Sequence, residues 1–249
     1  TDAWNFIAGL SMAISPGKAG EVLKPYVVRR VTQTPMARTI PALVTERLTD
    51  GIAMLLLAGI GITTYASDQI QWIVIPGLLT FVGLLVLANH TATSFFLNLF
   101  RKIPVIDKII PKIEEMIDAM RVCVAPIPLM WTVLLSIVAW AAECVAFQLI
   151  FLGLGVDAGF DVCFFLYAFA TVAGSAMPGG IGVADGALIG GAMKFMAVTK
   201  AQAITAAILT RVATLWLGVG LGAFALLQIT RILQQYPVPS STPTDESEA

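Results

Sequence analysis

Four apolar segments, each about long enough to cross a bilayer, recur along this chain at 48–66, 70–89, 129–153 and 203–230. A hydrocarbon core of about 30 Å needs roughly 20 apolar residues in helical form. Because the bilayer core holds no water, every backbone polar group in a span must be satisfied internally, as in helices or closed barrels. The alternation typical of barrel strands is absent. The sequence therefore predicts an all-α, polytopic membrane helical bundle.

Charge content agrees with this class, because charged residues make up only 12% of the chain, against about 25% in soluble domains. The basic residues are few and scattered, which excludes a nucleic-acid surface. We expect one transmembrane domain over 1–232, interfacial cytoplasmic helices within it at 90–128, and a disordered polar tail at 233–249. The chain opens inside an apolar segment without Met, so we also expect further spans ahead of it.

Two shorter apolar arms, 3–14 and 162–176, each end in a glycine-proline turn. The first turn reads SPGKAGE from Ser15, and the second reads MPGGIGV from Met177. Neither arm can cross the bilayer alone, since a helix rises only about 1.5 Å per residue. Paired broken segments in a membrane chain are typical of a binding site between structural repeats. Each turn therefore predicts a Gly/Pro-broken, re-entrant hairpin.

Loop charge predicts that the two hairpins are inverted. Segment 15–47 holds six basic residues and 90–128 holds five, whereas 66–70 and 154–161 hold none. The positive-inside rule places the basic segments in the cytoplasm. The three spans at 48–66, 70–89 and 129–153 separate the hairpins, so these would enter from opposite faces. The alternative, in which 162–196 crosses fully, removes this symmetry.

Charged residues near the first turn are candidates for headgroup binding. Gly17 and Gly20 allow close backbone approach, and amides at the following helix start favour an anion. Lys18, Glu21 and Lys24 recur every three residues, so they would share one helix side. The alternative is an ordinary cytoplasmic helix with snorkelling lysines.

An arginine follows each turn by about 30 residues, expected at the head of the next apolar helix. Arg47 lies in TERLTDG beside Glu46 and Asp50, and Arg211 takes the corresponding place after the second turn. Arginine binds phosphate bidentately, which lysine cannot do. The alternative is that the two arginines are interfacial anchors.

The second turn is dense in glycine, with Gly179, Gly180 and Gly182, and Asp185 is its only charge before Lys194. We predict that Asp185 pairs with a basic group across the repeat interface. Close helix packing through small residues is the alternative for the glycines. The predicted substrate-binding residues are Gly17, Lys18, Gly20, Glu21, Lys24, Glu46, Arg47, Asp50, Gly179, Gly180, Gly182, Asp185 and Arg211.

Glu143 lies inside the span at 129–153, where a carboxylate is costly unless it is paired or protonated. It is a candidate coupling carboxylate or arginine counter-ion, whereas Tyr167 and Trp216 are expected to be packing residues. The chain has one histidine and three isolated cysteines. We therefore expect no metal site, no cofactor and no histidine-based catalytic triad.

The ordered motifs SPGKAGEVLKPYVVRR, TERLTDGIAMLLL and MPGGIGVADGAL resemble the flippase-like membrane family that includes the transmembrane region of lysylphosphatidylglycerol synthase. The resemblance covers most of residues 1–232. It implies a multi-span fold with lipid as substrate. It also implies functional importance for the motif positions Pro16, Gly17, Gly20, Glu21, Glu46, Arg47, Asp50, Pro178, Gly179, Gly180 and Gly182. Residues 1–249 show neither a soluble synthase domain nor the N-terminal spans of full members, so the resemblance does not lead us to expect aminoacyl transfer.

These observations predict a lipid transporter or flippase, not an enzyme, in a bacterial cytoplasmic (inner) membrane. Its substrate would be an anionic or phosphate-bearing lipid. A second copy of the chain and a lipid-modifying enzyme are the candidate protein partners. The alternatives are a secondary transporter of a small anion, a membrane enzyme acting on lipid phosphate, and a non-transporting accessory subunit of a lipid-modifying system.

Overall fold

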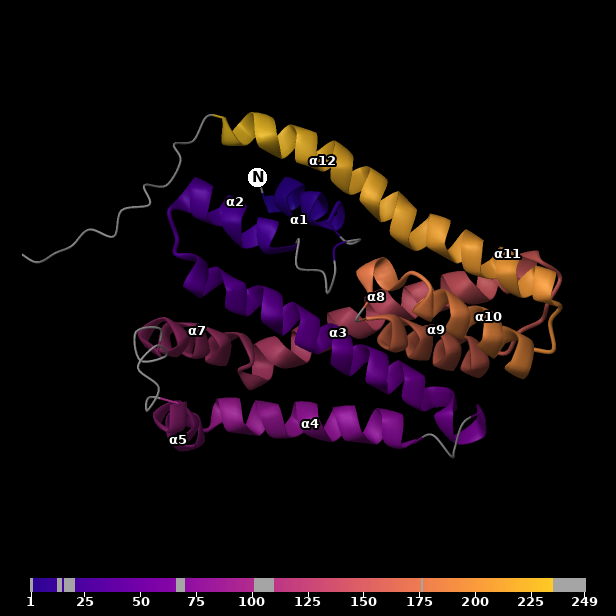
Figure 1. Cartoon of the computed structure of the whole chain (residues 1–249), viewed down its shortest axis with the longest axis horizontal. Coiled ribbons are helices and arrows are strands. Elements are labelled where there is room, and N and C mark those ends of the chain that lie inside the picture. The colour runs from indigo at the N-terminus through magenta and orange to yellow at the C-terminus, as the bar shows by residue number, and fades with distance from the viewer. Residues whose placement is uncertain are drawn as a thin grey trace, which may run out of the picture.

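A computed structural model describes residues 2–12, 15, 21–65, 70–100, 110–175 and 177–234, and every regular element in these ranges is helical (Figure 1). The elements are α1 (Asp2–Leu10), α2 (Leu23–Thr32), α3 (Met36–Tyr65), α4 (Gln71–Ala88), α5 (His90–Phe100), α7 (Ile110–Cys123), α8 (Pro126–Gly153), α9 (Phe160–Gly174), η3 (Pro178–Gly180), α10 (Val183–Phe195), α11 (Lys200–Arg211), η4 (Val212–Trp216) and α12 (Leu217–Leu233). The expected all-α class is confirmed for this part of the chain.

In the described part of the chain, two helices are long and apolar enough to cross a membrane, Pro126–Gly153 and Lys200–Arg231. The second is continuous through α11, η4 and α12, and η4 is a π-helical segment. The first contains the span expected at 129–153, and the second contains the span expected at 203–230. The expected span at 70–89 corresponds to α4.

Helix α3 corrects one expectation, because it begins at Met36 and not near residue 48. The helix passes through Pro41 without a break. Pro41 is the sixth residue of α3, so it removes the one backbone bond that its amide would donate to the Ala37 carbonyl, and this single loss near the helix start does not end the helix. Arg47 therefore lies eleven residues after Met36, inside the helix and not at its head. Arg211 likewise lies inside the continuous helix of α11, η4 and α12.

Helices α9 and α10 form a hairpin with η3 at its tip (Figure 1). Both open ends of this hairpin contact the same end of α3. The Tyr65 hydroxyl donates to Asp161 Oδ2 at 2.8 Å, and the Tyr65 and Phe195 ring centroids lie 5.7 Å apart. The hairpin therefore begins and ends at one end of the molecule, and its tip points back along α3.

Small residues allow the two arms of the hairpin to pack closely. A Cβ added at Gly174 would lie 2.6 Å from the Ala184 Cβ, and one added at Gly191 would lie 2.2 Å from Leu166 Cδ1. The main hydrophobic core adjoins this contact. Its largest buried members include Phe147, Phe151 and Leu166.

Helix α1 packs on α12, with α2 beside it (Figure 1). Ala8, Val27, Ala225 and Ile229 form a small buried cluster where these three helices meet. A Cβ added at Gly222 would lie 2.2 Å from the Ser11 nitrogen. The first predicted turn, including Gly17, Lys18 and Gly20, lies outside the described residues.

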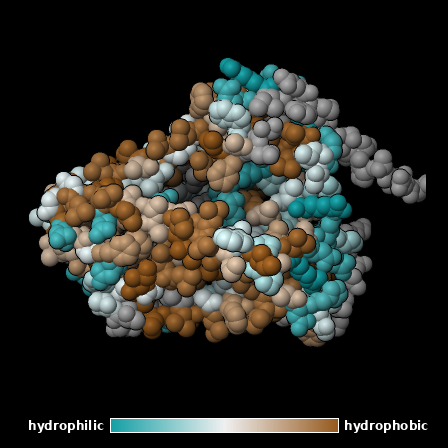
Figure 2. Space-filling view, turned by 180° about the vertical axis from the view of Figure 1, so that it is seen from behind, coloured by the Kyte–Doolittle hydropathy of each residue, from teal (hydrophilic) through white to brown (hydrophobic). Residues whose placement is uncertain are grey.

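A broad apolar surface covers much of the face shown in Figure 2, and large apolar side chains are also exposed along several helices. Exposed large side chains of α4, α8 and α12 contribute to it, among them Leu79, Leu135 and Leu227. Charged contacts gather at one end, where Arg38 Nε lies 2.8 Å from Glu115 Oε1 and Arg121 Nε donates to the Leu87 carbonyl. Exposed leucines of this kind on long helices are the surface expected of a protein whose solvent is lipid.

The packing at the hairpin gives a test of the fold. Gly174→Ala should lower stability by about 1–3 kcal/mol, because the new methyl group collides with Ala184 in a packed contact. Gly190→Ala in α10 is the matched control, since nothing lies within 4 Å of its added Cβ. The control should be neutral or slightly stabilising. Thermal unfolding in detergent measures both, and equal midpoints would contradict the packing described.

Candidate functional site

Five charged side chains from the start of α2, the residues just before it and the middle of α3 form a cluster, which we call the central cluster. Lys24 Nζ lies 3.1 Å from Glu46 Oε1, and Arg47 Nη2 lies 2.8 Å from the same oxygen. Arg47 Nη2 also lies 3.2 Å from Asp50 Oδ2, and Arg47 Nε lies 3.5 Å from Glu21 Oε2. Arg47 therefore meets three carboxylates, and Glu46 is shared between two cations.

Helix α8 completes the central cluster with two donors. Ser136 Oγ donates to Asp50 Oδ1 at 3.1 Å, and Trp140 Nε1 donates to the same oxygen at 3.0 Å. Sequence reasoning missed both residues. Their signal was a pair of polar groups four residues apart in an apolar helix, which places them on one face.

The central cluster lies well inside the helical bundle and yet remains partly accessible. Arg47 is about 16 Å along α3 from Met36 and about 27 Å from Tyr65, at 1.5 Å per residue. The side chains of Glu21 and Lys24 are 9% and 14% exposed, whereas Arg47 is 33% exposed. Figure 2 shows a recess in the apolar surface with hydrophilic residues inside it.

The charges of the central cluster do not balance within the described residues. Three carboxylates face two cations, which gives a net charge of −1. Lys18, predicted to belong to this group, lies outside the described residues. An anion that binds here therefore needs compensation, for example by replacing a carboxylate on Arg47, by carrying a positive charge of its own, or by protonation of a carboxylate. The described His, Cys, Asp and Glu side chains form no group of three suited to a metal ion.

Arg211 lies at a second site, where it ties α11 to the tip of the hairpin. Its Nη1 donates to the Gly179 carbonyl at 2.9 Å, and its Nη2 donates to the Gly180 carbonyl at 3.1 Å. Its Nε pairs closely with Asp185. The Gly182 amide donates to the other oxygen of Asp185 at 2.9 Å. We call these residues the turn latch.

The turn latch requires glycine, because Gly179, Gly180 and Gly182 have φ of 59°, 70° and 85°, a region that other residues rarely adopt.

The turn latch also corrects one expectation. Asp185 does pair with a basic group, but Arg211 lies in the same half of the chain, so the pair does not bridge the two halves. The Arg211 donors face backbone carbonyls of the turn, whereas the sequence suggested turn amides open to an anion.

Glu143 accepts a hydrogen bond from Tyr167, so Tyr167 is not the simple packing residue that the sequence suggested. Tyr167 is 5% exposed, and its hydroxyl also interacts with Thr214 of η4. Glu143 follows Trp140 by three residues on α8 and so continues the polar face begun by Ser136. This face runs from the central cluster toward the helix that carries the turn latch. Trp216, also expected to pack, is exposed in η4.

With this geometry in place, comparison with known proteins identifies the family. Residues 3–222 match the family described as the lysylphosphatidylglycerol synthase TM region. The chain belongs to this family of membrane proteins. The resemblance drawn from the ordered motifs is therefore confirmed.

A relative is the UPF0104 membrane protein of Methanothermobacter thermautotrophicus, which is 25% identical over 225 residues. The alignment covers 82% of this chain and 66% of the relative, so the chain spans just under two thirds of that protein. No solved structure matches the chain.

The turn latch gives a second prediction. Arg211→Lys keeps the charge but cannot donate to Asp185 and both carbonyls in one fixed plane. We expect a loss of about 0.5–1.5 kcal/mol, since these partly buried acceptors lose the hydrogen bonds of the guanidinium. Hydrogen–deuterium exchange of 177–186 in detergent should rise in this variant. Arg231→Lys, at an exposed position near the end of α12, should leave it unchanged, and unchanged exchange in both would argue against the latch.

Proposed function

We propose that this chain moves a phosphate-bearing lipid between the leaflets of a cytoplasmic membrane, with the central cluster as the headgroup site. Membership of a membrane family supports the setting. The observation that carries the proposal is the central cluster itself. A charge at membrane depth costs about 2.5–3.5 kcal/mol on insertion scales. Five such groups, of which Glu46 and Arg47 remain about one third exposed, are a large cost for a purely structural contact.

The partners of Arg47 suit exchange with a phosphate. Asp50 has alternative donors in Ser136 and Trp140, and Glu46 has an alternative partner in Lys24. Arg47 can therefore release either carboxylate without leaving it unpaired. A phosphate could then take both guanidinium donors in a bidentate contact.

The net charge of −1 favours a headgroup that carries an amine as well as a phosphate. In such a headgroup the phosphate would contact Arg47 and the amine would contact Glu21, whose buried Oε2 has no hydrogen bond within the described residues and lies 3.5 Å from Arg47 Nε. Charge would then balance better than with a phosphate alone. The presence of an amine on the headgroup narrows the class of lipid substrate and leaves the proposed transport activity unchanged.

An open groove between α9 and α10 supports a lipid over a small anion. It has a volume of about 250 Å³, and its lining includes Phe165, Phe169, Gly186, Gly190 and Lys194. A Cβ added at Gly186 or Gly190 would meet nothing within 4 Å. The groove therefore has room for part of an acyl chain beside the hairpin. A transporter of a small anion would need no such apolar surface.

Movement would follow from the two hairpins, which we propose to be inverted and re-entrant. The contacts of Tyr65 with both ends of the α9–α10 hairpin support a re-entrant unit in this proposal. Rocking of one hairpin unit against the other would expose the headgroup site to each leaflet in turn. An accessory subunit of a lipid-modifying system is the competing proposal, and it needs no movement of lipid.

Leaflet-resolved lipid movement in liposomes that contain the full-length protein tests the proposal. The probes are fluorescent phosphatidic acid, with phosphate only, phosphatidylethanolamine, with phosphate and amine, and diacylglycerol, with neither. Arg47→Gln should slow the phosphate lipids at least tenfold, because one strong charged contact is worth about 1.5–3 kcal/mol. Arg231→Gln is the control and should stay within about twofold of wild type. Wild-type rates equal to those of empty liposomes would reject the function.

A separate prediction concerns coupling through Glu143. If protonation of Glu143 drives the change between states, an imposed pH gradient should alter the wild-type rate, and Glu143→Gln should remove that response. The control is Asp157→Asn, since Asp157 is an exposed carboxylate in the link between α8 and α9. The same assay is run with and without the gradient. A wild-type response in the Glu143 variant would remove this residue from coupling.

A further inference from the structure

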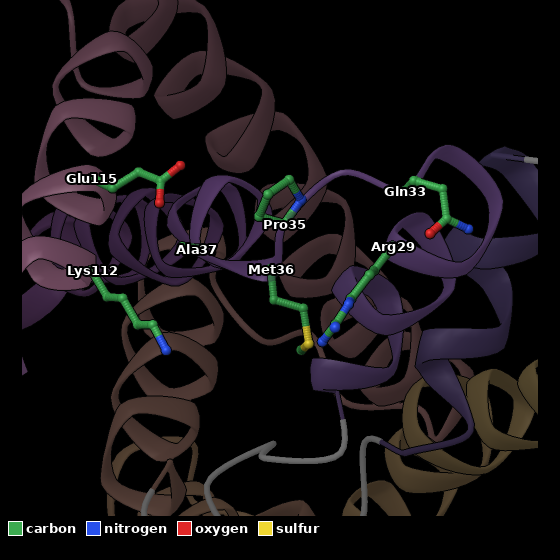
Figure 3. Close-up of a pocket in the computed structure, with 7 residues that line it drawn as sticks. All are labelled: Arg29, Gln33, Pro35, Met36, Ala37, Lys112 and Glu115. Atoms are coloured by element: carbon green, nitrogen blue, oxygen red, sulfur yellow. The ribbon is translucent and has the colours of Figure 1, made fainter. Parts of the chain in front are cut away.

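A polar pocket of about 420 Å³ lies apart from the central cluster, where the C-terminal end of α2, the start of α3 and α7 meet (Figure 3). Its lining includes Arg29, Gln33, Met36, Lys112 and Glu115. In Figure 3, Lys112 extends from α7 on one side and Arg29 from α2 on the other, with Met36 between them. Pockets of about 300–1,000 Å³ are the usual size for small-molecule sites.

The pocket is electropositive, in contrast to the central cluster. Its one lining carboxylate, Glu115, is held by Arg38 at 2.8 Å. Within the described residues, neither Arg29 nor Lys112 makes an ion pair. With Arg38 counted, three cations face one carboxylate, a net charge of +2. Two basic side chains therefore remain available to an anion from opposite walls of one cavity.

The position of the pocket suits a headgroup at the membrane surface. It lies at the end of the molecule where α3 begins, within the basic segments that the positive-inside rule assigns to the cytoplasm. Arg29 follows Lys24 of the central cluster by five residues on α2, or about 7.5 Å of helix rise, and projects from a different side of the helix. The pocket and the central cluster therefore share one helix and are separated by little more than one helical turn along it.

We propose that this pocket binds a phosphate group, held between Arg29 and Lys112. The source is either a lipid headgroup of the cytoplasmic leaflet or a free phosphate compound in solution. For a lipid, the pocket is the docking site that precedes the central cluster, an assignment that rests on the proposed function. Binding of a phosphate group does not depend on lipid movement, so the two can fail separately.

Equilibrium binding to the full-length protein in neutral detergent tests the pocket. The probes are a short-chain phosphatidic acid, inorganic phosphate, and phosphatidylcholine, whose phosphate carries a bulky trimethylammonium group. The test variant is Arg29→Gln with Lys112→Gln. The control variant is Lys200→Gln with Arg231→Gln, which removes the same charge from two exposed positions outside the pocket.

Phosphatidic acid should bind wild type and the control alike, and its Kd should rise at least tenfold in the test variant, since two charge-assisted contacts are lost. Inorganic phosphate binding with the same sensitivity would support a free phosphate as the natural ligand. Binding of phosphatidic acid alone would support the lipid. Equal Kd values in both variants, or equal losses in both, would overturn the pocket.

The result is separable from the transport assay. If Arg47→Gln stops lipid movement and leaves phosphatidic acid binding at the wild-type Kd, both proposals are supported. If the wild type binds phosphatidic acid through Arg29 and Lys112 but moves no lipid, the pocket stands and the transport function fails. If lipid moves in the wild type while the test variant binds as tightly as the wild type, the pocket fails alone.

Discussion

Arg47 and the three carboxylates around it hold together helices that have few other polar contacts in the described chain. An unpaired charge at this depth would cost several kcal/mol, so α2 must bring Glu21 and Lys24 to α3, and α8 must bring Ser136 and Trp140 to Asp50. The pairs thus fix which faces of three helices meet. Apolar side chains do little to select which helix faces meet in a membrane, because lipid tails are as apolar as the side chains themselves.

The two arginines that follow the glycine-proline turns have different physical roles. Two of the three carboxylates that Arg47 meets, Glu46 and Asp50, have a second donor, so these contacts can exchange. Two of the Arg211 contacts are to backbone carbonyls of a turn that has three glycines at positive φ. Those carbonyls cannot rotate away without remaking the turn. We infer that Arg47 belongs to the part of the molecule that changes partners, and Arg211 to the part that moves as one body.

Sequence alone predicted the features that depend on local composition. Long apolar runs correctly predicted α4, α8 and the helix from α11 to α12, since an apolar segment of that length in lipid has few conformations other than a helix. The predicted start of α3 was wrong. Pro41 and the charged residues before Arg47 are typical of a loop, and the packing of α2 and α7 on this part of α3 cannot be read from the local sequence. The roles of Tyr167, Ser136 and Trp140 could not be read from the sequence, since their partners lie on other helices. The first turn, with Gly17, Lys18 and Gly20, lies outside the described residues, and its role stays a prediction.

The charges along α2 and α3 bear on how transport could be driven. A phosphate group that leaves the pocket of Arg29 and Lys112, with its surplus of cations, meets a central cluster with one more carboxylate than cations. Without compensation this step is electrostatically unfavourable, and the low dielectric of the bundle increases the penalty. An amine on the headgroup, a further cation such as Lys18, or protonation of a carboxylate would each remove it. The need for such compensation makes the central cluster suited to act as a gate, which admits a headgroup only when its own charge is matched.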